Sequence, residues 1–192
     1  MGDFQVSTLL DWAMFALTSA VTGSANPPEN FCRRLDLQVA WDADLYSDLC
    51  CEGLGYVSFG DVFPSWGDFP EPDVVRQADY GSCSPPAWGV AIRMGLLRCV
   101  PVSQHEHGMP SCTDWTTASD QQTVDSQSLR RASCALRQHI VSNSDTPGPF
   151  WGMSAVIGNQ GQIQLQGGCV ERNVTVTIQM PNCDCFDPWQ TG

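Results

Sequence analysis

The segment at residues 172–180, R-N-V-T-V-T-I-Q-M, constrains the fold of this chain more than any other stretch. Val174, Val176, Ile178 and Met180 alternate with polar side chains at every position between them. Successive side chains of a β-strand point to opposite faces, so this pattern gives the segment one apolar and one polar face. We therefore expect a strand of an antiparallel sheet that is buried on one face and in contact with water on the other.

Two segments have the periodicity of amphipathic helices, at residues 7–22 and 117–141. Trp12 and Phe15 widen the apolar stripe of the first, and Thr117 and Ser119 are acceptable capping starts for the second. The apolar stripes consist of Leu9, Leu10, Ala13, Leu17 and Val21 in the first segment and Leu129, Ala132, Leu136 and Ile140 in the second.

Further strands are expected at residues 32–40, 54–63 and 88–98. The face of 88–98 opposite its large apolar residues carries Gly89, Ala91 and Gly95, which suggests that a helix packs closely there. The turn-forming residues 158–161 predict a hairpin between short strands at 151–157 and 161–166.

These segments predict one domain of the α+β class over residues 1–192. Its sheet would be antiparallel with about four to five strands, and two helices would cover one face in the order α-β-β-α-β-β, with an extra strand near the front. The helix 7–22 would precede a sheet-and-helix core at 35–180 and an irregular C-terminal tail at 181–192. The 17 glycines and 13 prolines favour long loops, above all at residues 64–86.

Charge excludes several function classes. The net charge is −12, and the chain contains no lysine. Tight binding to nucleic acid or to an anionic membrane needs a basic patch, which the arginine pairs at 33–34 and 130–131 do not supply. Asp3 stands where a signal peptide would carry positive charge, so we expect residues 7–22 to be a helix of the mature domain.

Ten cysteines leave two interpretations open. They form either a disulfide framework of a secreted protein or a set of buried thiols, which pack as small apolar residues and could oxidise after release from a reducing cytoplasm. Cys83 and Cys112 are a candidate disulfide, although sequence alone does not determine pairing.

Catalytic motifs are not visible in this sequence. It has no nucleophile-elbow, phosphate-loop, H-E-x-x-H or dinucleotide-binding motif, so we expect no enzyme and no cofactor. His105, His107, Cys183 and Cys185 are weak zinc candidates, because their spacing lies outside the common patterns for zinc sites.

Several motifs together resemble the small head–tail connection proteins of tailed phages that infect actinobacteria, in the tail terminator or tail completion family. The resemblance covers about residues 37–185. The motifs that carry it are V-A-W-D at 39–42, C-C-E-G-L-G-Y-V at 50–57, V-F-P-S at 62–65, F-P-E-P at 69–72, R-M-G-L-L-R-C at 93–99, G-G-C-V at 167–170, V-T-V-T-I at 174–178 and C-D-C at 183–185.

This resemblance implies a virion protein that forms a ring, most often a hexamer, in the host cytoplasm. The ring caps the tail tube and joins it to the stopper or connector protein of the head, and DNA passes through the lumen without adhering. Loop residues would contact neighbouring subunits and partners, although each tryptophan, taken singly, is more often a local core residue. These residues are Trp66, Asp68, Glu71, Asp73, Trp115 and Trp189.

Two alternatives stay open at this point. The chain could instead be the stopper or adaptor protein of the same junction. More distantly, it could be a secreted, disulfide-rich binding module, which predicts a cleaved N-terminus and fully oxidised cysteines.

Overall fold

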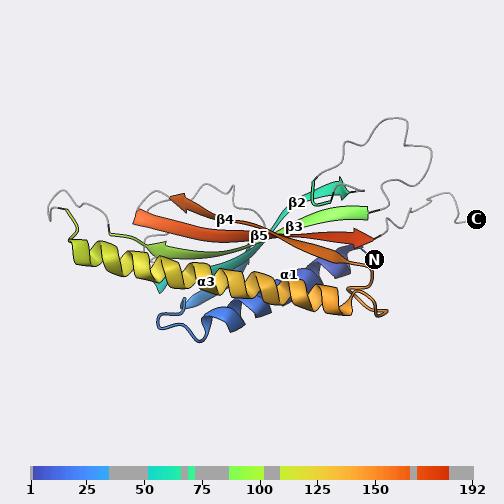
Figure 1. The fold of residues 1–192 in the computed structure, drawn as a ribbon, viewed down its shortest axis with the longest axis horizontal. Coiled ribbons are helices and arrows are strands. Elements are labelled where there is room, and N and C mark those ends of the chain that lie inside the picture. Colours follow the sequence, from blue (N-terminus) through green and yellow to red (C-terminus); the bar gives the residue numbers. More distant parts are fainter. Residues whose placement is uncertain are drawn as a thin grey trace, which may run out of the picture.

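The computed structural model describes residues 2–34, 52–65, 69–71, 87–101, 109–164 and 168–181. These form two helices on one face of a five-stranded sheet, in the order helix, three strands, helix, two strands (Figure 1). The α+β class, the two helices and the extra strand near the front are therefore confirmed.

The elements have the following bounds. Helix α1 spans Gly2–Val21 and is followed by strands β1 at Asn30–Arg34, β2 at Leu54–Ser65 and β3 at Ala87–Cys99. Helix α3 spans Cys112–Asn143 and is followed by β4 at Ser154–Gln164 and β5 at Cys169–Pro181.

The sheet is mixed, with the strand order β1-β2-β3-β5-β4. Four strands pair antiparallel, but β1 runs parallel to β2, so the expectation of a purely antiparallel sheet is wrong at this edge. Parallel neighbours need a long crossover, and residues 35–53 between the two strands are long enough to provide one.

The apolar face of the sheet lies under the two helices, as the alternation in residues 172–180 predicts. Val174, Val176 and Ile178 are fully buried. Helix α1 packs on β1, β2 and β3, while α3 packs on β3, β4 and β5 (Figure 1). Burial of a valine or isoleucine side chain of this kind stabilises the fold by about 1.5–3 kcal/mol. The helices contribute Leu9, Ala13, Leu17, Val21, Leu129, Ala132, Leu136 and Ile140 to this core.

Helix α3 starts five residues earlier than the sequence pattern indicates. Its N-cap is Ser111, whose hydroxyl accepts a hydrogen bond from the backbone N–H of Asp114, while the Ser111 N–H donates to the Asp114 carboxylate. Thr117, one of the two expected starts, lies inside the helix and donates its hydroxyl to the carbonyl of Thr113. The reciprocal cap at 111–114 therefore sets the start of the helix.

The hairpin expected around residues 158–161 is not formed. Residues 154–164 are one strand that pairs with β5 throughout, with a bulge between Ile157 and Gln160. Gly158 lies so close to β5 that an added Cβ would stand 3.2 Å from the carbonyl oxygen of Thr175. The glycine-rich sequence therefore marks a bulge rather than a turn.

Glycines on the other face of the sheet lie beneath aromatic rings rather than beneath a helix. Tyr56 is the register partner of Gly95, and Phe63 is the partner of Gly89. A Cβ at Gly95 would stand 2.3 Å from the Tyr56 ring, and one at Gly89 would stand 2.2 Å from the Phe63 ring. These aromatic–glycine pairs help to fix the register of β2 on β3.

Part of this second face is also buried, so it is not uniformly wet. Tyr56, Leu54, Leu97 and Cys169 form a second, smaller apolar cluster there. The Tyr56 hydroxyl donates to the buried Glu171 carboxylate at 2.5 Å, and the Asn173 side chain donates to the same oxygen at 2.5 Å.

A buried ion pair joins β3 to α3. The Arg98 guanidinium donates two hydrogen bonds to the Asp125 carboxylate, at 3.0 and 3.1 Å, and a third to the Asn26 carbonyl at 2.8 Å. Gln121 donates to the same carboxylate at 3.0 Å. Because Asn26 follows α1, this one guanidinium connects the strand with the chain that leaves the first helix and with the second helix.

We expect Gly95→Ala to lower the free energy of unfolding by about 1–3 kcal/mol, because the new methyl group has to displace the Tyr56 ring. Chemical denaturation measures this change. Gly23→Ala is the matched control, since a Cβ at Gly23 meets nothing within 4 Å. Equal effects of the two substitutions would contradict the role assigned to the aromatic–glycine pair.

Arg98→Met should cost about 3–5 kcal/mol of unfolding free energy, because it leaves the Asp125 carboxylate buried without its partner. The exposed Arg130→Met serves as the control. Adding Asp125→Leu to Arg98→Met should recover part of the loss, since the unpaired buried charge is then removed. A double variant no more stable than Arg98→Met would show that the pair is not the source of the effect.

Candidate interaction surface

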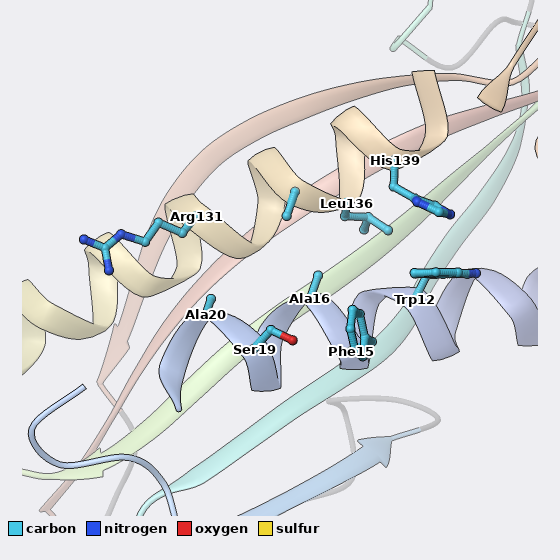
Figure 2. Close-up of a pocket in the computed structure, with 9 residues that line it drawn as sticks. Trp12, Phe15, Ala16, Ser19, Ala20, Arg131, Leu136 and His139 are labelled. Carbon is cyan, nitrogen blue, oxygen red and sulfur yellow. The ribbon is translucent and has the colours of Figure 1, made fainter. Parts of the chain in front are cut away.

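A groove of about 310 Å³ runs between α1 and α3 on the outer side of the helix layer (Figure 2). Residues of α1 at intervals of three and four line one wall, and α3 forms the other. Because residues at this spacing share one face of a helix, the same periodicity that buries α1 also builds the groove. Its lining consists of Trp12, Phe15, Ala16, Ser19, Ala20, Arg131, Ala135, Leu136 and His139.

Aromatic rings cluster at one end of the groove. Trp12 stacks on His139 with ring centroids 3.8 Å apart and an interplanar angle of 25° (Figure 2). Phe150 meets the His139 ring edge to face at 5.0 Å. Phe15 contacts Trp12 edge to face at 5.7 Å, and yet 63% of Phe15 is exposed. The stack holds Trp12 in place, while Phe15 is left open to solvent.

The other end of the groove is cationic. Arg131 lies on α3 at this end, and its guanidinium points away from the aromatic end (Figure 2). Aromatic and arginine side chains are the types that contribute most to binding energy in protein interfaces. This groove is therefore suited to receiving an apolar side chain with an acidic neighbour.

A second exposed apolar region lies at the start of α3, where the first turns of the helix project beyond the strands (Figure 1). Trp115 is 51% exposed there, and Met109, just before the helix, is 88% exposed. The Ser111–Asp114 cap holds the turn that carries Trp115. Its two hydrogen bonds, first that of the Ser111 side chain and then that of its backbone, lower the pKa of the Asp114 carboxyl below its ordinary value.

The structure places two of the six expected interface residues. Trp115 is exposed but lies on helix α3 rather than in a loop, and Glu71 is exposed as well. Trp66, Asp68, Asp73 and Trp189 lie outside the described residues. The groove itself was not predicted, because Trp12 and Phe15 were assigned only to the apolar stripe of the first helix.

The candidate zinc ligands His105, His107, Cys183 and Cys185 also lie outside the described residues. Within the part of the chain that the structure describes, no cluster of three histidine, cysteine or acidic side chains could hold a metal ion.

Of the candidate disulfide pair, Cys112 is an exposed free thiol in the structure, and Cys83 lies outside the described residues. Cys134 is likewise free and exposed. By contrast, Cys99 and Cys169 are each disulfide-bonded. The described cysteines are therefore neither all reduced nor all oxidised.

Comparison with known proteins gives no family assignment. No protein-family profile matches the chain, and no curated protein matches it. Among the described helices, none has the length and apolar character needed to cross a membrane.

The cap of α3 should respond to acid. Because the folded-state pKa of Asp114 is lowered, its carboxylate stabilises the first turn above the unfolded-state pKa, and this contribution is lost as the pH falls through the folded-state value. We expect the protection factors of the Asp114 and Trp115 amides, which both donate to Ser111, to fall only below about pH 4. Hydrogen exchange measured against pH tests this.

Ser111→Ala is the control for the same experiment, because it removes the hydroxyl that lowers the pKa. An NMR titration of the Asp114 carboxyl should then give a pKa closer to the ordinary value. A carboxyl that titrates at its ordinary pKa in the unmodified chain would contradict the observed cap.

Proposed function

We propose that this protein is a phage structural subunit, a tail terminator. Copies of it would form a ring, most simply a hexamer, that caps the tail tube and joins it to the stopper or connector protein of the head. The proposed role is non-catalytic and belongs to the head–tail junction of the virion, after assembly in the host cytoplasm. The observation that carries the proposal is the open groove between α1 and α3, with its exposed Phe15 and its stacked Trp12 and His139.

The groove supports an assembling subunit because the exposed Phe15 belongs to a cluster of apolar lining residues and is not an isolated surface side chain. Exposed apolar patches rimmed by polar residues commonly mark sites where other proteins bind. The projecting end of α3, with Trp115, supplies a second such region on a different part of the subunit. A ring at a junction needs separate contacts for its neighbours and for the partners on either side.

The charge of the chain supports a ring through which DNA passes. A net charge of −12 without lysine disfavours adhesion to phosphates. Two of the described arginines are in addition already ion-paired, Arg33 with Asp11 and Arg98 with Asp125. An acidic lumen would let DNA slide without being held.

The order of elements supports the same proposal through resemblance. The tail terminator family is expected to place a helix, a β-hairpin, a second helix and further strands in one subunit. The chain has these elements in this order with one addition, since the parallel edge strand β1 precedes the antiparallel pair β2 and β3 between the two helices. A stopper or adaptor protein at the same head–tail junction is the nearest alternative.

A secreted binding module is the more distant alternative. The disulfide-bonded Cys99 and Cys169 favour it, but such a module predicts full oxidation, and Cys112 and Cys134 carry free thiols. The two proposals differ in the mass of the particle expected in solution, since a secreted module would remain a monomer while a tail terminator would form a ring.

Native mass spectrometry of the purified chain should show a ring-sized oligomer, with six copies as the main species. Phe15→Asp should shift this population towards monomer by at least tenfold, because a charge then occupies the exposed anchor of the groove. Thermal melting should be nearly unchanged, since Phe15 is largely exposed in the single subunit.

Gln127→Asp is the matched control, because it adds the same charge at an exposed position of α3 that does not line the groove. It should leave the oligomer intact. A wild-type chain that stays monomeric at every concentration would contradict the proposed ring.

A further inference from the structure

Strand β4 forms one edge of the sheet, and its sequence lacks the charged residues and the proline that commonly protect such an edge. No strand within the described part of the chain pairs with its outer side. Its eleven residues, S-A-V-I-G-N-Q-G-Q-I-Q, contain no charged residue and no proline. Natural edge strands are commonly blocked by lysine, proline or a covering segment, because their free N–H and C=O groups otherwise pair with another strand.

Apolar side chains add to the exposed hydrogen-bonding groups of this edge. Val156 is 37% exposed and Ile163 is 42% exposed. Their register partners on β5 are Thr177 and Glu171, which places both on the sheet face that the helices do not cover. The bulge between Ile157 and Gln160 divides the strand into two short halves, so the free edge suits a short partner strand rather than a long one.

On the helix side of the same edge lies a hollow of about 270 Å³ between β4 and α3. It is lined by Cys134, Arg137, Gln138, Val141, Ser142 and Ile157. The Arg137 guanidinium donates to the Ala155 carbonyl at 3.1 Å, which fixes one wall of the hollow on the strand. A strand added to β4 would therefore find a place for side chains on both of its faces.

The opposite edge of the sheet supplies a strand of suitable length and direction. Strand β1 has five residues, and within the described part of the chain it pairs only with β2. The ladders give β1, β2 and β5 one direction, and β3 and β4 the other. A second copy that continues the sheet in the same orientation would thus place its β1 antiparallel to β4, which is the more stable pairing. Its helices would stay on the same side of the sheet.

We propose that the β4 edge binds the β1 edge of a second copy of this chain. This inference rests on the proposed ring, because it names the contact between neighbouring subunits. The two edges differ, so the contact is heterologous and repeats from copy to copy until the ring closes. Each subunit then uses both edges of its sheet, and neither edge is left open in the finished ring.

Hydrogen exchange on the wild-type chain tests the proposal without any substitution. Amides of β4 and of β1 should both exchange at least tenfold more slowly in the oligomer than in dilute monomer, while amides at exposed positions of α3 outside both candidate surfaces, such as those of Thr123 and Gln127, should not change. Protection of β4 without β1 would overturn the proposal and would indicate two-fold pairing of β4 with itself.

Lysines on the edge provide the second test. The double variant Val156→Lys and Ile163→Lys should lower the oligomer population at least tenfold while the melting temperature stays within a few degrees, because both side chains are partly exposed. Gln127→Lys is the control and should assemble as the wild type does. Intact rings formed by the double variant would overturn the edge contact but not the ring, whereas a wild-type chain that never assembles would contradict the proposed function itself.

Discussion

The sheet of this protein has one strongly apolar face, and the rest of the structure follows from the need to cover it. Val174, Val176 and Ile178 of the central strand β5 cannot be left in water, and α1 and α3 together supply the cover. The Arg98–Asp125 pair holds this cover in place, because it connects β3 with α3 and with the chain that leaves α1. The two helices that cover this face leave a groove between them, so the candidate interaction surface is a consequence of how the face is covered.

Much of the fold could be predicted from periodicity alone. The alternation in residues 172–180 identifies the central strand and its buried face, and the spacing of Leu129, Ala132, Leu136 and Ile140 identifies α3 and its buried stripe. The ends of elements are less predictable, because Ser111, Thr117 and Ser119 are each followed three residues later by aspartate or glutamine, so several positions fit the capping pattern. The sequence around Gly158 was misread for a related reason, since glycine and asparagine favour turns and bulges alike.

The candidate surfaces were harder to predict than the fold, because they depend on which elements become neighbours. Trp12 and Phe15 both look like core residues of α1 until α3 is placed. Trp12 then stacks on His139 of α3, while Phe15 stays exposed. The glycines of β3 were assigned to a helix contact, although the rings of Tyr56 and Phe63 on the adjacent strand fill that space. Similarly, the free edge of β4 depends on the strand order, which periodicity does not determine.

The central claim is that this subunit completes its exposed surfaces by joining copies of itself around a hole. Electron microscopy of the purified full-length chain at high protein concentration tests this claim most directly. The account predicts end-on views of closed rings with an open centre and a single dominant symmetry. Fields of separate particles of about 21 kDa, or open filaments without closure, would contradict it.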